Sequence, residues 1–272
     1  MRKFRILLAS VMLVASVLWL ALGAAAPSVM KISEFSQIIP SAILSCLGTS
    51  VFWLVASLFF GRVYCATVCP LGTLQDLSVW LRRKTNKGFA FRYEEGRSIR
   101  FPILIAYLVS IVAGVLAVGY LLEPWNIMRD AAAAIRPQTI DSTWDALFSG
   151  KSMLALAVGS ASGVLSIVVI LIWAWRGGRR FCNVVCPIGT VLGALHSQTM
   201  MHIAIDPDKC ISCMKCEDVC SSRCINVVGR QVDNSRCVRC FDCIDVCPND
   251  AIRFQVNRNH HRQTPLLDPT AK

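Results

Sequence analysis

Charged residues are scarce in this chain of 272 residues, where they make up 17% of the sequence against 54% for hydrophobic residues. They are absent from four long apolar runs, which cover residues 6–26, 38–61, 101–122 and 153–175. A helix needs about 20 apolar residues to cross a hydrocarbon core of about 30 Å, and each run is that long. The sequence therefore predicts an α-helical polytopic membrane domain with four transmembrane helices.

Histidine is also rare, and two signature motifs are missing. All four histidines, His196, His202, His260 and His261, lie outside the apolar runs, so none can bind a haem within the bilayer. There is no Cys-x-x-Cys-His motif for a c-type haem, and no glycine-rich fingerprint follows a strand-like segment. We therefore expect neither haem nor flavin, and no nucleotide-binding fold.

Acidic residues are outnumbered: 17 Asp and Glu stand against 28 Lys and Arg, which gives a net charge of +11. The basic residues gather before the first run, after the second and after the fourth, where they include Arg62, Arg179 and Arg180. The positive-inside rule then places both termini and the segments after runs two and four on the cytoplasmic side of a bacterial inner membrane. Basic flanks of this kind are expected to face lipid headgroups, so no nucleic-acid partner is needed.

The first apolar run allows a second interpretation. Its basic start and alanine-rich end resemble a cleaved secretory signal. Its apolar stretch is longer than that of a usual signal, which favours a retained helix. Cleavage would leave the orientation of every later segment unchanged.

Cysteine, in contrast, is abundant, with 14 residues. A cytoplasm-facing protein keeps its thiols reduced, so metal ligation or redox chemistry is favoured over a disulfide framework. Eight of the cysteines form two runs with the spacing Cys-x2-Cys-x2-Cys-x3-Cys, which begin at Cys210 and, 27 residues later, at Cys237. In bacterial ferredoxins with this spacing, three cysteines hold one iron–sulfur cube and the fourth holds the other.

The interlocked spacing predicts two [4Fe–4S] clusters. The first would be held by Cys210, Cys213, Cys216 and Cys247. The second would be held by Cys237, Cys240, Cys243 and Cys220. Zinc is the main rival for thiolate ligands, but its sites usually pair cysteines in two separate knuckles. A further cysteine, Cys224, aligns with Ala251 of the other half and either packs as a small residue or serves as a substitute ligand.

A second repeat follows two of the apolar runs. Residues 61–73 (GRVYCATVCPLGT) and 178–190 (GRRFCNVVCPIGT) share a Cys-x3-Cys-Pro motif, so the membrane domain is predicted to contain two repeated helix-pair units. If the motifs are helical, each cysteine pair lies one turn apart on one face, and the two copies can bring four thiols together. Three interpretations remain: packing at helix ends, a thiol–disulfide relay, or a shared redox-metal site, which we favour. The four residues are Cys65, Cys69, Cys182 and Cys186.

These features divide the chain into three parts. A four-helix membrane domain with the two Cys-x3-Cys-Pro motifs covers residues 1–202. A small α+β ferredoxin domain of the bacterial dicluster type covers residues 203–256. Residues 257–272 form a polar tail with two prolines and are expected to be disordered.

Together these residues resemble the NapH/MauN family of membrane ferredoxin-type proteins, in particular the quinol-dehydrogenase membrane subunit of the periplasmic nitrate reductase type. The similarity rests on the four runs, on the stretches YCATVCPLGTLQDLSVWLRRK and FCNVVCPIGTVLGAL, and on the dicluster module. It implies that electrons pass from menaquinol or ubiquinol in the quinone pool to a periplasmic iron–sulfur or cytochrome partner and a terminal reductase. On this resemblance the chain would be the electron-transfer subunit of a quinol dehydrogenase in anaerobic respiration.

The alternative is an electron-supplying assembly factor for a metalloenzyme, similar to the FixG-type maturation factors. Those proteins carry an additional soluble domain after the ferredoxin part, whereas this sequence stops at Lys272, so we expect the quinol dehydrogenase. One interpretation of the outer loop between runs three and four is a quinol site, where Glu123 or Asp130 would accept protons and Trp125 would stack on the ring. An ordinary interfacial loop with a tryptophan anchor is the interpretation that we favour.

Overall fold

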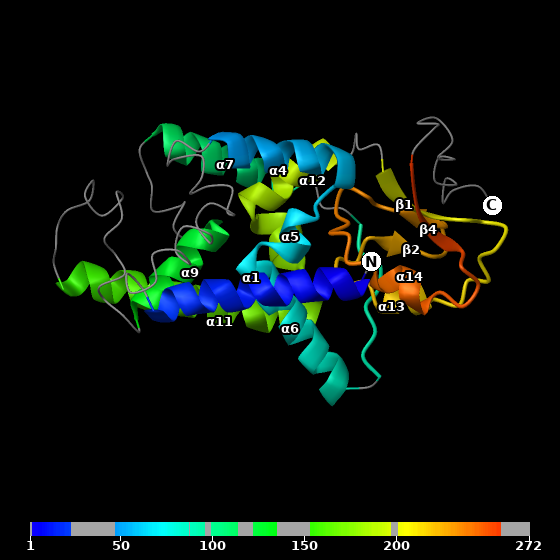
Figure 1. Cartoon of the computed structure of the whole chain (residues 1–272), viewed down its shortest axis with the longest axis horizontal. Helices are drawn as coiled ribbons and strands as arrows, with labels where there is room; N and C mark the ends of the chain where they lie inside the picture. Colours follow the sequence, from blue (N-terminus) through cyan, green and yellow to red (C-terminus); the bar gives the residue numbers. More distant parts are fainter. Residues whose placement is uncertain are drawn as a thin grey trace.

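A helical bundle and a small α+β module make up the part of the chain that the structure, a computed structural model, describes (Figure 1). That part comprises residues 2–22, 47–86, 88–95, 99–113, 122–134, 153–196 and 201–256. The long helices of the bundle are α1 (Arg2–Leu22), α4 (Leu47–Phe60), α6 (Pro70–Thr85), α7 (Arg100–Val112) and α11 (Met153–Gly177). The shorter ones are α5 (Tyr64–Thr67), α9 (Pro124–Ala133), α12 (Pro187–His196) and the π-helical turn η3 (Phe181–Val185). The predicted polar tail lies outside the described residues.

Large apolar side chains are exposed along α1, α4, α7 and α11. The side chains of Leu7, Phe52, Val109 and Leu165, one from each helix, are all more than half exposed. A soluble monomer rarely exposes apolar surface of this extent, which marks an interface with a membrane or another protein.

One helical segment among the described residues is both long and apolar enough to cross a bilayer. It is Gly159–Gly177 in α11, and two shorter apolar helices are Val51–Phe60 and Arg100–Val112. The other three predicted spans extend into residues outside the described part. The prediction of four transmembrane helices therefore stays a prediction.

The two Cys-Pro pairs begin helices in the same way. Cys69 has an extended backbone (φ −67°, ψ 114°), and Pro70 is the first residue of α6. Cys186 likewise is extended (φ −64°, ψ 121°) before Pro187 opens α12. Proline suits this position because its fixed φ is helical and its missing N–H would have no partner in the first turn. The sequence repeat is therefore also a repeat of local structure.

The α+β module is built on two small antiparallel sheets. Strand β1 (Met201–Ile205) pairs with β4 (Ile252–Val256), from Met201 opposite Val256 to Ile205 opposite Ile252. Strand β2 (Ile225–Asn226) pairs with β3 (Gln231–Val232), and the two short helices are α13 (Lys215–Asp218) and α14 (Asp242–Val246). Left-handed backbone conformations recur 27 residues apart, in the pairs Ser212 and Arg239, Met214 and Phe241, and Arg223 and Asp250. The module is thus two similar halves that close on each other.

Four helix ends of the bundle meet this module on one side (Figure 1). At the start of α1, the Arg2 guanidinium pairs with Asp242 at 2.9 Å, and at the start of α7 the Arg100 guanidinium donates to Ser235 Oγ at 3.2 Å. After α11, the backbone N–H of Arg179 donates to the carbonyl of Ser221 at 2.9 Å. Just after α4, Arg62 Nη1 donates to the carbonyl of Ser235 in the module at 3.5 Å. The N-terminus and both Cys-Pro motifs therefore lie on the same side of the bundle as the module.

Candidate redox-metal sites

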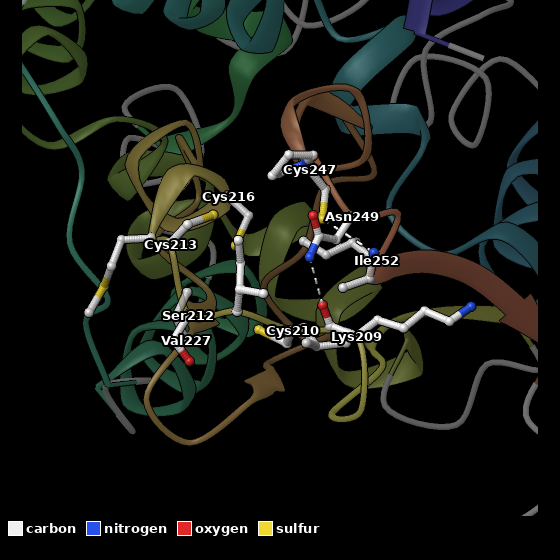
Figure 2. A pocket seen from close by; sticks show the side chains of 14 residues that line it. Lys209, Cys210, Ser212, Cys213, Cys216, Val227, Cys247, Asn249 and Ile252 are labelled. Carbon is white, nitrogen blue, oxygen red and sulfur yellow. Dashed lines mark hydrogen bonds between the residues drawn. The ribbon is translucent and has the colours of Figure 1, made fainter.

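Four cysteines line a hollow in the first half of the module (Figure 2). They are Cys210, Cys213, Cys216 and Cys247. Three of them belong to α13 and the loop before it, and the fourth directly follows α14. Apolar side chains such as Ile205, Val227 and Ile252 complete the lining. Soft thiolates in an apolar hollow fit an iron–sulfur cluster, and these are the residues that the spacing assigns to the first one.

A second hollow repeats this arrangement with the halves exchanged. Its lining includes Cys220, Cys237, Cys240 and Cys243, the set assigned to the second cluster. Here α14 and the loop before it supply three cysteines, and the fourth follows α13. A hydrogen bond with Cys224 and the positive charges of Arg239 and Arg62 lower the pKa of Cys237 to about 6, although burial opposes this shift.

The four motif cysteines, two from each repeat, come together in one buried core. Cys65, Cys69, Cys182 and Cys186 all belong to it. Ile127 and Met128 of α9 pack into the same core, and so do Val238 and Cys240 of the module. The structure thus brings the two motifs into one place, directly beside the second hollow. Across the described ranges, no three His, Cys, Asp or Glu side chains are close enough to hold a single metal ion, so a metal at these thiols stays a prediction.

Both motifs contain a turn wider than an α-helix. The backbone N–H of Cys69 donates to the carbonyl of Tyr64, and that of Cys186 donates to the carbonyl of Phe181, each five residues back. Such π-type turns occur frequently at functional sites. The buried amide of Gln75 adds a donor to the core, with Nε2 3.3 Å from Cys182 Sγ. The cysteines are therefore held on wide turns rather than on the regular helix that the sequence suggested.

Two buried arginines connect the repeats in a crossed arrangement. Arg62, from the first repeat, donates through Nη2 to the carbonyl of Cys182 in the second at 2.7 Å. Arg179, from the second repeat, donates through Nη1 to the carbonyl of Cys65 in the first at 2.7 Å. Both side chains are almost completely buried. The expectation that these basic residues face lipid headgroups is therefore wrong: they are inside, because each one bonds to the opposite motif.

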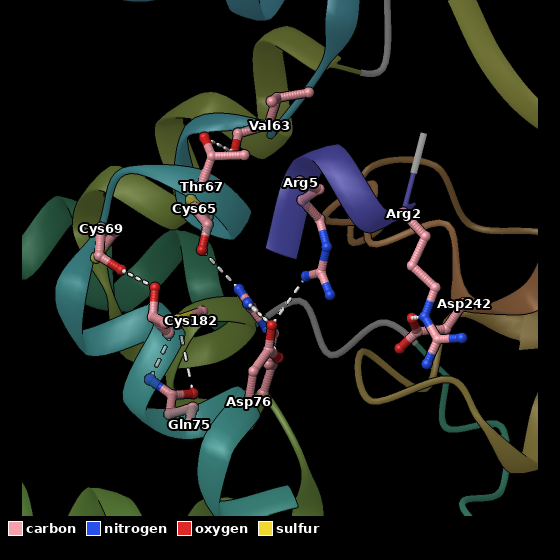
Figure 3. Close-up of polar contacts among 12 residues, drawn as sticks. Arg2, Arg5, Val63, Cys65, Thr67, Cys69, Gln75, Asp76, Cys182 and Asp242 are labelled. Atoms are coloured by element: carbon pink, nitrogen blue, oxygen red, sulfur yellow. Dashed lines mark hydrogen bonds and ion pairs between the residues drawn. The ribbon is translucent and has the colours of Figure 1, made fainter. Parts of the chain in front are cut away.

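The two arginines differ in how their charge is balanced. Arg179 forms two hydrogen bonds with the Asp76 carboxylate, at 2.7 and 2.6 Å, and Asp76 also accepts from Arg5 at 3.0 Å (Figure 3). Burial raises the pKa of Asp76, but Arg179 and Arg5 outweigh it and hold that pKa below its usual range. Among the described residues, Arg62 bonds only to neutral oxygens, including Asn183 Oδ1 at 2.7 Å, and its Nε has no partner.

Residues predicted to form an outer loop instead fold as α9, which packs against α11. Glu123 and Trp125 are buried, so this segment is not an exposed loop, and a quinol site there stays a prediction. The Tyr107 hydroxyl donates to Glu123, and Asn126 Nδ2 donates to Glu123 Oε2 at 2.7 Å. Asp130 lies 3.5 Å from Arg129. Tyr107 was not predicted from the sequence, because nothing in an apolar run distinguishes a tyrosine that hydrogen-bonds a carboxylate.

Comparison with known proteins agrees with the iron–sulfur assignment. A family described as "4Fe-4S binding domain" matches residues 43–88 and 160–197, and a second family of the same description matches residues 230–253. The chain is 28% identical to the ferredoxin-type protein NapH of Haemophilus influenzae, over 71% of the chain and 59% of that protein. It is 29% identical to NapH of Escherichia coli, over 66% of the chain and 54% of that protein.

A third relative comes from methylamine metabolism. The methylamine utilization ferredoxin-type protein MauN of Methylobacillus flagellatus is 28% identical, over 60% of the chain and 49% of that protein. The chain therefore spans about half to three fifths of the length of these curated relatives. No solved structure matches.

Proposed function

We propose that this chain, an iron–sulfur electron-transfer protein related to the NapH and MauN ferredoxin-type proteins, is the quinol-oxidising subunit of a membrane-bound oxidoreductase. Electrons would pass from menaquinol or ubiquinol to a periplasmic iron–sulfur or cytochrome partner and its terminal reductase. The observation that carries the proposal is the continuity of the thiol sites. The four-cysteine core contacts Cys240 of the second hollow, and Cys216 and Cys220, at and just after α13, line the two different hollows.

The two hollows are proposed to hold two [4Fe–4S] clusters with the ligand sets assigned from the spacing. Bound clusters would supply one-electron carriers. The chain contributes a thiol set for each, a largely apolar lining, and left-handed turns at Met214 and Phe241 that start α13 and α14 between the ligands. Both halves have the same left-handed turn before the short helix, which supports two similar centres.

A multi-pass position in a bacterial inner membrane is part of the proposal, with the N-terminus and the module in the cytoplasm. The exposed apolar side chains on four helices support contact with lipid. Four helix ends of the bundle contact the module, which supports placing both Cys-Pro motifs on the same face of the membrane as the module. The basic end of α6, with Arg82, Arg83 and Lys84, fits the cytoplasmic face.

The quinol is proposed to reach the protein from the bilayer beside the cysteine core. A hollow of about 350 Å³ runs along α4 and is lined by aromatic residues that include Trp53, Phe60 and Tyr64. That volume is in the range of small-molecule sites, and Tyr64 directly precedes Cys65. Glu123 offers a buried carboxylate directly before the helix α9, which packs into that core. A quinol must release protons when it is oxidised, and Glu123 is the acceptor we assign.

The four motif cysteines are proposed to bind a third thiolate-held metal centre. Near them, Arg5, Arg62 and Arg179 are buried, and Asp76 is the carboxylate that pairs with two of them. Two positive charges are then left in the interior, where an uncompensated charge is costly. Four thiolates around an iron–sulfur core would carry about two negative charges, which would balance them.

Metal analysis of the anaerobically purified full chain tests this set of sites. Two clusters give about 8 iron and 8 sulfide per chain, and a third centre raises iron to about 10 for a two-iron or about 12 for a four-iron cluster. Cys65→Ser and Cys182→Ser should each remove that increment and leave the other clusters in place. About two zinc per chain with little iron would contradict the iron–sulfur assignment.

Redox turnover tests the quinol. The purified protein should be reduced by a quinol analogue, followed optically, and should pass the electrons to its periplasmic partner. A protein that exchanges electrons with no quinol but reduces copper or iron would contradict the proposal and favour the assembly factor.

A further inference from the structure

Cys224 lies in the second hollow without belonging to its four predicted ligands. Its side chain is buried, and its Sγ is 3.5 Å from Cys220 Sγ. Cys237, a predicted ligand from the other half of the repeat, lines the same hollow. Cys224 therefore contacts one predicted ligand directly and shares the hollow with another.

The first hollow has the same backbone at the equivalent position but no thiol there. The N–H of Ala251 donates to Cys247 Sγ at 3.3 Å, just as the N–H of Cys224 donates to Cys220 Sγ at 3.5 Å. The preceding residues, Arg223 and Asp250, are both left-handed, with φ of 54° and 48°. The two hollows therefore offer a matched pair of positions, one with the methyl side chain of alanine and the other with the thiol of cysteine.

The protonation state of the sulfurs determines which of them can donate a hydrogen bond. A cysteine sulfur bound to iron has lost its proton and can only accept a hydrogen bond. Among Cys220, Cys224 and Cys237, only Cys224 then keeps an S–H to donate. Reduction adds negative charge to a cluster and its sulfurs, so a donor aimed at a ligand sulfur stabilises the reduced form more than the oxidised form.

We propose that the Cys224 thiol donates a hydrogen bond to the Cys220 sulfur of the second hollow and makes its cluster the easier of the two to reduce. The inference rests on the proposed function, because it requires a cluster in each hollow. The second hollow adjoins the four-cysteine core through Cys240, whereas Cys213 of the first hollow is exposed. The electron is thereby kept beside the membrane part and away from the exposed site.

A redox titration of the full chain, followed by electron paramagnetic resonance, tests this tuning. At fixed potential, Cys224→Ala should lower the reduced-to-oxidised ratio of the second cluster about three- to tenfold, which corresponds to about 30–60 mV for one electron. Iron content and the first cluster should not change. Cys224→Ser should keep part of the effect, because a hydroxyl also donates.

Ala251→Cys is the matched variant. It places a thiol at the equivalent position of the first hollow and should make that cluster easier to reduce, with the second cluster unchanged. Loss of one cluster from Cys224→Ala would overturn the proposal in favour of a ligand role. If the reduction potentials are unchanged in Cys224→Ala and Ala251→Cys proteins that carry both clusters, then Cys224 has only a packing role. Absence of iron–sulfur clusters from the unmodified chain would instead contradict the proposed function.

Discussion

Removal of the negative charge of Asp76 should lower the stability of the fold strongly, because Asp76 is the counter-charge of buried arginines. It accepts two hydrogen bonds from Arg179 and one from Arg5, and Arg179 in turn holds the carbonyl of Cys65. Asp76→Asn keeps the shape of the side chain but removes its charge. The Arg179 guanidinium, which is 0% exposed, would then remain in the interior without a carboxylate.

The size of the expected stability loss follows from how deeply each partner of the Asp76–Arg179 pair is buried. Breaking a buried ion pair by neutralising one partner costs about 3–5 kcal/mol, because the other charge stays buried. The Asp76 side chain is 25% exposed, so water can partly replace it, and we expect a loss at the lower end, about 3 kcal/mol. The four-cysteine core should loosen as well, because Arg179 is also bonded to the first motif.

The pH dependence has a definite direction. Burial opposes ionisation, but Arg179 and Arg5 hold the folded-state pKa of Asp76 below its usual range. The pKa of an aspartate in an unfolded chain is about 3.9. The contribution of Asp76 is therefore complete above about pH 5 and is lost as the pH falls through the depressed folded-state pKa. The Asn variant should lack this acid-dependent loss.

Unfolding of the purified protein in detergent, followed by circular dichroism against denaturant and temperature, measures the effect. Asp218→Asn is the matched control, because Asp218 pairs with Arg92 at 3.8 Å and the two side chains are 37% and 62% exposed. An exposed pair of this kind contributes about 0–1 kcal/mol. If Asp76→Asn is no less stable than Asp218→Asn, then the reasoning about the buried guanidinium is refuted.

Two further predictions concern the motif and the proton acceptor. Gly189→Ala would place a Cβ against the carbonyl oxygen of Cys182, so we expect a loss of stability by thermal unfolding, whereas Gly159→Ala, with nothing within 4 Å, should be neutral or mildly stabilising. Equal stability of the two variants would contradict the tight fit. Glu123→Gln keeps a side chain for Tyr107 and Asn126 but cannot accept a proton, so quinol oxidation should slow severalfold at unchanged iron content, whereas Asp130→Asn should have little effect. Full turnover in Glu123→Gln would exclude it as the acceptor.

The cysteine sets could be predicted because spacing along the chain determines them. An interlocked spacing of thiols allows few ways to hold two clusters, and the hollows contain the expected sets. The helix starts at Pro70 and Pro187 follow a local rule of the same kind, because proline restricts its own backbone. Local rules of this kind need no knowledge of tertiary contacts.

The buried polar residues could not be predicted in the same way. Arg62 and Arg179 were counted as lipid-facing because the positive-inside rule considers position along the chain and ignores side-chain partners. Their burial depends on carbonyls more than 100 residues away in the sequence. Glu123 likewise became buried because Tyr107, on another helix, provides a hydrogen bond. Partners of this kind emerge only when the chain is folded.

The two motifs have a similar backbone, but the seventh residue after the second cysteine differs in charge between them. Asp76 lies at the position in the first repeat that Gly193 occupies in the second. Asp76 neutralises Arg179, whereas a side chain at Gly193 would lie within 2.7 Å of the Ser235 carbonyl, so the glycine lets the module approach. The module, in place of a carboxylate, then covers Arg62, whose charge helps to lower the pKa of Cys237. Asp76 therefore pairs with Arg179 within the bundle, whereas Arg62, which has no carboxylate partner among the described residues, lies toward the second hollow. The charge of Arg62 supports the proposal of an anionic centre in that hollow.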